Sequence, residues 1–223
     1  MSLETMEFGP VVVAFHDRVL RPRPWTMIQA SWAADLSPGL PPGPVLEVCA
    51  GAGHIGQAAA ALTGRHLVQV DVEPQACALA EANARANLMA TRVDVRCAEL
   101  EDALDADERF PLILADPPYV PQGEVLAYPD DPDLAINGGP DGLRMLRRCV
   151  RLAGAHVQPH GAVLLQLLGA AQVEGLAPEL HDAGLDVVDV RATDDRRAVA
   201  HLRPRTDERG TRDTAGSGTS WCE

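Results

Sequence analysis

The sequence predicts an α/β fold in which a mostly parallel sheet is covered by helices on both faces and ends in an antiparallel hairpin. Short apolar runs alternate with alanine-rich stretches, which is typical of repeated strand-helix units. A glycine-rich turn follows the first of these strands. Near the carboxyl end, only Asp194-Asp195-Arg196-Arg197 separate two strand-like runs, and so short a link permits only an antiparallel pair.

The chain has 223 residues, 46% of them hydrophobic, which suffices for one domain with a full core but not for two of ordinary size. We expect residues 1–35 to be a lead-in, with an amphipathic helix around Thr26 to Leu36, and residues 36–205 to form the domain. Residues 206–223 are rich in Thr, Gly, Ser, Asp and Arg, so they predict a disordered tail.

The first unit begins with the strand Val45 to Cys49 and continues through Ala50-Gly51-Ala52-Gly53-His54-Ile55-Gly56 into the helix Gln57 to Leu62. Glycine allows a sharp bend and a close approach of ligand to backbone, so this order is typical of a nucleotide-binding turn. Glu47 lies inside the strand, where a buried carboxylate is costly unless it meets a cation. The ammonium group of a ligand would supply that cation.

The second unit is the strand Leu67 to Val70, which ends at Asp71, followed by a helix from Glu73 to Asn87. Asp71 would lie at the strand tip, where a ribose diol is bound in related layouts. NAD and S-adenosylmethionine share that ribose, so Asp71 does not distinguish them, and capping of the next helix is an alternative role.

The most informative run, Leu112 to Tyr119, is an apolar strand that ends in Asp-Pro-Pro-Tyr. Proline lacks an N–H, so the carbonyl of Pro117 can remain free and join the carboxylate of Asp116 in accepting both hydrogens of one NH2 group. The ring of Tyr119 can stack on the attached π-system. The turn therefore predicts a site for a planar nitrogen substrate, with a proline-stiffened loop as the plainer alternative.

The last strands are Leu185 to Thr193 and Ala198 to Leu202, and Gly161 to Ala171 is a core strand that runs into a helix. An antiparallel end to a parallel sheet is the layout of class I methyltransferases and differs from the all-parallel dinucleotide fold. A nicotinamide oxidoreductase thus becomes the less favoured hypothesis.

Five segments together resemble, in order, the motifs of the HemK/PrmC family, which methylates a glutamine amide of peptide chain release factors with S-adenosylmethionine. They are Arg21 to Thr26, Val45 to Gly53, Val70-Asp71, Asp116 to Val120 and Ala135 to Leu143. The resemblance implies the Rossmann-like class I methyltransferase fold, with seven strands and an antiparallel terminal hairpin. The chain looks like a compact form without the amino-terminal helical domain of the bacterial enzymes.

The resemblance also implies roles for individual residues. It places Asp116, Pro117 and Tyr119 at the acceptor nitrogen, with a glutamine-containing protein loop as the partner. Around S-adenosylmethionine it places Glu47, Ala50, Gly51, Gly53, Asp71, Val72, Glu99, Leu100 and Asp116. For Glu99 the alternative is a solvated charge within an acidic stretch.

Four residues depart from the family pattern. Asp116 replaces an Asn, a form commoner in enzymes that methylate exocyclic amines of nucleobases, and Cys49 replaces a glycine, so its backbone must avoid positive φ or accept strain. Trp25 replaces an acidic residue and Gln166 replaces a strand-end Glu. The alternatives are therefore a nucleobase N-methyltransferase and a donor-binding protein that has lost transfer.

Charge and cysteine content indicate which ligands and which cellular compartment are to be expected. The net charge of −13 disfavours nucleic acid, whose binding depends on basic side chains. The five cysteines are dispersed, without zinc-ligand spacing, which favours a reduced cytoplasmic protein with no metal. No basic leader precedes the first apolar run, and no apolar stretch is long enough to span a membrane.

Overall fold

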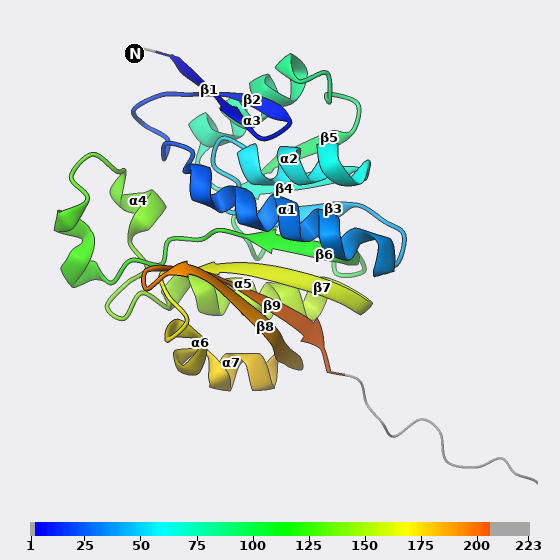
Figure 1. Ribbon diagram of the computed structural model, residues 1–223, viewed down its shortest axis with the longest axis vertical. Coiled ribbons are helices and arrows are strands. Elements are labelled where there is room, and N and C mark those ends of the chain that lie inside the picture. Colours follow the sequence, from blue (N-terminus) through cyan, green and yellow to red (C-terminus); the bar gives the residue numbers. More distant parts are fainter. Residues whose placement is uncertain (1–2, 206–223) are drawn as a thin grey trace, which may run out of the picture.

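A seven-stranded sheet of order β5-β4-β3-β6-β7-β9-β8 forms the centre of the computed structural model, which describes residues 3–205 (Figure 1). The strands from β5 to β7 are parallel, and β9 is antiparallel to both β7 and β8. This confirms the predicted class I methyltransferase layout with its terminal hairpin. The strands are β3 (Val45–Val48), β4 (Leu67–Asp71), β5 (Val93–Cys97), β6 (Phe110–Ala115), β7 (Val157–Leu167), β8 (Leu185–Asp194) and β9 (Arg197–Pro204).

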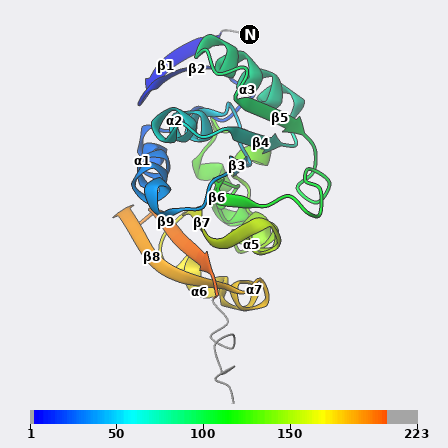
Figure 2. The same cartoon turned by 90° about the vertical axis from the view of Figure 1, so that its right-hand side faces the viewer.

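Helices cover both faces of this sheet, with α1 and α2 on one side and α5 on the other (Figure 2). Alternation along β6 sets the two cores: Leu112 and Leu114 pack toward α1 and α2, whereas Ile113 and Ala115 pack toward α5. The helices are α1 (Met27–Leu36), α2 (His54–Thr63), α3 (Pro74–Ala86), α5 (Arg144–His156), α6 (Gln172–Gly175) and α7 (Ala177–Asp182).

The amino-terminal segment contains a hairpin of β1 (Glu4–Phe8) and β2 (Val11–Phe15) that the sequence did not predict. Two side-chain amides, Asn83 of α3 and Asn87 directly after that helix, hold β2 in place. Asn83 Oδ1 accepts from the Ala14 N–H at 2.8 Å and its Nδ2 donates to the Ala14 carbonyl at 3.0 Å, and Asn87 makes the same pair of bonds with Val12. The helix expected in this segment is α1, while the predicted tail at 206–223 lies outside the described residues.

Between β6 and α5 the chain leaves the sheet and forms a lobe at the carboxyl ends of the strands (Figure 1). The lobe contains the 3-10 helix η3 (Gln122–Ala127) and the short helix α4 (Asp133–Ile136). Val120 and Asn137 form a parallel bridge at its base. The turn predicted to carry the chemistry, residues 116–119, therefore lies between the sheet and this lobe. No helix within residues 3–205 is both long and apolar enough to cross a bilayer.

Candidate active site

The loop after β3 is held in left-handed backbone conformations. Gly51 has φ +54° and Gly53 has φ +81°, values that glycine adopts without a Cβ clash. Cys49 also has a positive φ, +57°. The Cys49 backbone therefore accepts the strain that was one of two expectations for this departure from glycine.

Asp71 lies at the tip of β4 and anchors that loop. Its Oδ2 accepts from the Gly51 N–H at 2.7 Å and its Oδ1 from the Glu73 N–H at 2.9 Å. Burial raises the pKa of the carboxyl group. Each oxygen keeps a further lone pair, and a Cβ built on Gly51 would meet nothing within 4 Å. With the 44% exposed side chain of Val72 alongside, the space and the acceptors fit an adenosine group.

Glu47 finds its partners within the protein. The residue is 2% exposed, and its carboxyl group accepts from the Gly56 N–H at 2.9 Å and from Gln69 Nε2 at 2.5 Å. Burial raises its pKa to about 8. The chain itself therefore supplies a donor to each oxygen of this carboxyl group, and both donors are neutral. A cofactor contact of Glu47 remains a prediction.

The acidic side chain in the segment after β5 is held by an ion pair with a helix. Glu99 is exposed and its carboxylate pairs with Arg148 of α5 at 2.8 Å, and Arg148 also pairs with Glu101. Glu99 is thus exposed but ion-paired, and its contact with the cofactor stays a prediction. Leu100, the next residue, and Ala50 of the glycine loop are both buried, with 7% and 3% exposure.

The Asp-Pro-Pro-Tyr turn forms one wall of a cavity of about 160 Å³, which we call the acceptor cavity. Within residues 3–205, nothing donates a hydrogen bond to the Asp116 carboxylate or to the Pro117 carbonyl. Burial raises the pKa of Asp116 to about 7 and also raises that of Tyr119. The Tyr119 carbonyl accepts from Gln172 Nε2 at 3.0 Å, which fixes the turn. Asp116 and Pro117 thus both line this cavity, and their acceptor oxygens have no donor among residues 3–205. Their contact with an acceptor nitrogen stays a prediction.

Arginine and aromatic side chains from distant segments line the rest of the acceptor cavity. Two guanidinium groups contact the ring of Trp25, with Arg197 Cζ at 3.9 Å from the ring centroid and Arg23 Cζ at 5.6 Å. Arg23 binds Asp131 at 2.5 Å, and Arg196 donates to the Tyr128 hydroxyl at 3.2 Å. Sequence reasoning missed most of this wall. The only signal was the resemblance of the 21–26 segment to a family motif.

Gln166 is absent from the lining of this cavity. It is 1% exposed, and its Oε1 accepts from Gln29 Nε2 of α1 at 3.3 Å. A buried pair of neutral amides thus stands where the family pattern has an acid. No cluster of three or more His, Cys, Asp or Glu side chains that could hold a metal ion occurs in the described part of the chain.

Comparison with known proteins identifies the family. The methyltransferase small domain matches residues 35–128. The release factor glutamine methyltransferase of Cereibacter sphaeroides is 38% identical over 130 residues, 56% of this chain and 46% of that protein. Its counterpart in Mycolicibacterium smegmatis is 30% identical over 194 residues, 84% of this chain and 67% of that protein.

A ribosomal protein uL3 glutamine methyltransferase of Bradyrhizobium diazoefficiens is 33% identical over 65% of this chain and 47% of its own length. A methyltransferase from Pyrococcus furiosus shares the fold, with a TM-score of 0.65 at 17% identity over 88% of this chain and 90% of that one. The chain spans about half the length of the first curated relatives it matches. It belongs to the release factor glutamine methyltransferase (HemK/PrmC) family of S-adenosylmethionine-dependent methyltransferases.

Proposed function

We propose that this protein transfers a methyl group from S-adenosylmethionine to the side-chain amide nitrogen of a glutamine in a protein loop. The observation that carries the proposal is that the Asp116 carboxylate and the Pro117 carbonyl have no donor within residues 3–205 and that both residues line a cavity with Trp25, Tyr119 and Tyr128. One NH2 group has two hydrogens for two such acceptors. The names of the relatives support release factors as the first candidate and ribosomal protein uL3 as the second.

The cofactor supplies a methyl group on a sulfonium that a nitrogen lone pair can displace. The Gly51 to Gly53 backbone, Asp71 and Val72 would hold its adenosine part. An amide nitrogen attacks weakly because its lone pair is delocalised. Asp116 and Pro117 would orient that lone pair by binding both hydrogens, and Tyr119 would stack on the amide plane. The ionised Asp116 carboxylate can also accept a proton as the nitrogen becomes cationic.

Asp71 gives a direct test of cofactor binding. We expect Asp71→Ala to weaken binding of S-adenosylhomocysteine by about 1 to 3 kcal/mol, since hydrogen bonds to a charged group are lost and the loop anchor at Gly51 is removed. Asp71→Asn keeps one acceptor oxygen, so its affinity for S-adenosylhomocysteine should lie between those of the wild type and the Ala variant. Calorimetry measures both, with thermal unfolding as the check that each variant is folded. Wild-type affinity in the Ala variant would contradict the assignment.

The substrate is tested with labelled methyl donor. The protein is incubated with purified release factors, uL3, and total RNA or DNA fragments, and mass spectrometry locates the added methyl group. We expect it on the glutamine of a Gly-Gly-Gln segment. Methylation of a nucleobase amine would instead favour a nucleobase N-methyltransferase, a function that Asp116 and the aromatic walls support and the net charge of −13 opposes. Donor binding without transfer to any of them would contradict enzymatic activity.

A further inference from the structure

The indole N–H of Trp25 is a buried hydrogen-bond donor without an acceptor. Trp25 belongs to the 3-10 turn η1 (Pro24–Thr26) before α1, and it lines the acceptor cavity together with Asp116 and Pro117. Its Nε1 atom is buried and has no hydrogen-bond partner within residues 3–205. A buried donor without a partner is costly, so one that is retained in a residue of a cavity wall is suited to an acceptor atom of the ligand.

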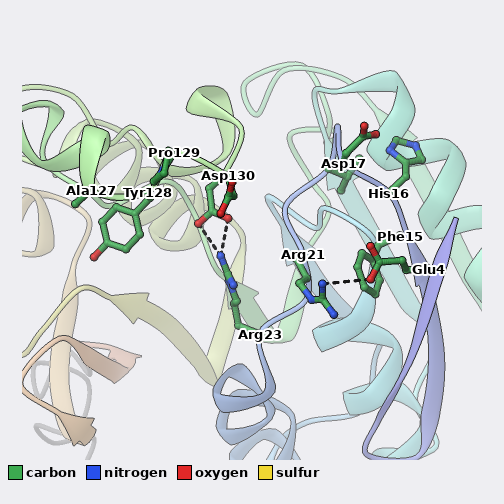
Figure 3. Close-up of a pocket in the computed structure, with 12 residues that line it drawn as sticks. Glu4, Phe15, His16, Asp17, Arg21, Arg23, Ala127, Tyr128, Pro129 and Asp130 are labelled. Atoms are coloured by element: carbon green, nitrogen blue, oxygen red, sulfur yellow. Dashed lines mark hydrogen bonds and ion pairs between the residues drawn. The ribbon is translucent and has the colours of Figure 1, made fainter. Parts of the chain in front are cut away.

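The charged neighbours of this ring cannot take the indole hydrogen. The guanidinium groups of Arg197 and Arg23, which contact the ring, have donors only. Both are anchored elsewhere: Arg23 points toward the lobe in Figure 3 and binds Asp131 at 2.5 Å, and Arg197 binds Asp194 at 3.3 Å. The two arginines therefore hold the ring of Trp25 in place and leave its N–H unused.

A glutamine side chain brings a group that matches this donor. A primary amide has two N–H donors and one carbonyl oxygen that accepts. In the proposed function, the Asp116 carboxylate and the Pro117 carbonyl take both hydrogens, which leaves the oxygen to be satisfied as it loses water. A carboxylate at position 25, as in the family pattern, can only accept, whereas the indole of Trp25 can only donate.

We propose that Trp25 positions the acceptor glutamine by donating its indole N–H to the side-chain carbonyl oxygen, while Asp116 and Pro117 hold the NH2 group. Three contacts to the two ends of one amide fix its plane, and with it the direction of the nitrogen lone pair. This inference rests on the proposed function, because it takes the methyl acceptor to be a carboxamide.

The contact serves binding more than the chemical step. As the nitrogen lone pair forms the new bond to the methyl carbon, it no longer delocalises onto the oxygen, so the oxygen becomes a weaker acceptor. The bond from Trp25 is then no stronger in the transition state than in the bound substrate. Trp25→Phe should therefore raise KM for a glutamine peptide and leave kcat close to that of the wild type.

The test uses three labelled peptides that differ only at the glutamine of a Gly-Gly-Gln segment. One carries glutamine, one carries 5-oxonorleucine, a methyl ketone that keeps the oxygen and lacks the NH2 group, and one carries norleucine, which lacks both. Fluorescence anisotropy measures their binding to the full chain with S-adenosylhomocysteine. Trp25→Phe should weaken the glutamine and ketone peptides by about three- to ten-fold, the usual effect of one hydrogen bond, and leave the norleucine peptide unchanged.

Further variants separate the N–H from the packing of the ring. Benzothienylalanine at position 25 keeps the two fused rings and lacks the N–H, so it should reproduce the effect of Trp25→Phe. Trp32→Phe makes the same change outside the lining of the acceptor cavity and should bind all three peptides as the wild type does. Asp116→Ala should weaken the glutamine peptide but not the ketone peptide, which has no N–H for Asp116. Thermal unfolding checks that each variant is folded.

The possible failures are distinguishable. An equal effect of Trp25→Phe on all three peptides, no effect on any of them, or no peptide binding at all would overturn the assignment of Trp25. The expected pattern without methyl transfer to glutamine would contradict the proposed function and leave the contact from Trp25 to the oxygen standing. Methyl transfer to glutamine with unchanged binding of the ketone peptide by Trp25→Phe would do the reverse.

Discussion

Asp116→Ala is expected to lower kcat/KM for methyl transfer by about 10² to 10⁴-fold while leaving the affinity for S-adenosylhomocysteine close to that of the wild type. The carboxylate has no partner among residues 3–205 and lies at the acceptor cavity, so its removal affects the acceptor far more than the cofactor. The matched control is Asp182→Ala, an exposed aspartate on α7. Full activity of the Asp116→Ala variant on any wild-type substrate would remove the turn from the mechanism.

Asp116→Asn separates positioning from proton transfer. Its side-chain oxygen still accepts one hydrogen bond, so an enzyme that only orients the amide should retain substantial activity, whereas one that needs a proton acceptor should lose roughly 10²-fold or more. Because burial raises the pKa of Asp116 to about 7, the wild-type kcat/KM should rise with pH through about 7 and level off above it. The Asn variant should lack that rise, and a rise of the same size in both proteins would contradict the assignment.

The raised pKa of Asp116 also predicts that replacing this residue by Asn stabilises the folded protein at high pH. The folded-state value lies above the ordinary value of 3.8, so stability contributed by protonated Asp116 is present at low pH and is lost as pH rises through about 7. Asp116→Asn, which never ionises, should therefore melt a few degrees above the wild type at pH 8.

Gly56→Ala is expected to destabilise the fold strongly. A Cβ at this position would lie 2.9 Å from Glu47 Cδ and 3.0 Å from Leu67 Cδ1, and it would collide with the Glu47 carboxylate. Helix α2 must then move away from β3, which breaks the bonds from Gly56 and Gln69 to Glu47. Overpacking and a buried carboxyl group without partners together suggest a loss of about 3 kcal/mol or more.

Thermal unfolding measures this effect, and a loss of that size corresponds to a fall in Tm of about 6 to 12 °C for a domain of this length. Gly39→Ala is the control, since its Cβ would meet nothing within 4 Å and its backbone is not left-handed. A Tm equal to that of the wild type would contradict the prediction, because it would show that α2 accommodates the extra methyl group without a loss of stability. Donor affinity should fall with Tm, because the glycine loop leads directly into α2.

Local patterns predicted most of the sheet. The strand Leu67 to Asp71 and the two strands of the terminal hairpin can each be recognised from length and apolar character within one short segment. The short link between the last two strands predicts their antiparallel pairing. The Asp-Pro-Pro-Tyr turn was equally visible, because all its chemical groups lie in one short run of the chain.

The amino-terminal hairpin and most of the cavity walls could not be predicted in this way. β2 is held by amides of Asn83 and Asn87, some 70 residues away, and no local pattern contains that information. Arg23, Tyr128 and Arg197 come from three segments that only the topology brings together. The partners of Glu47 could not be predicted for the same reason, since Gln69 belongs to the neighbouring strand.

Asn83 joins the two halves of the site. Its Nδ2 donates both to the Ala14 carbonyl of β2 and, at 2.9 Å, to the Ala52 carbonyl between the two glycines of the loop. Order in the loop and order in the hairpin therefore depend on the same amide. The hairpin leads into the segment that supplies Arg23 to the acceptor cavity. A change of Asn83 would therefore disturb the backbone of the glycine loop and the anchoring of the hairpin together.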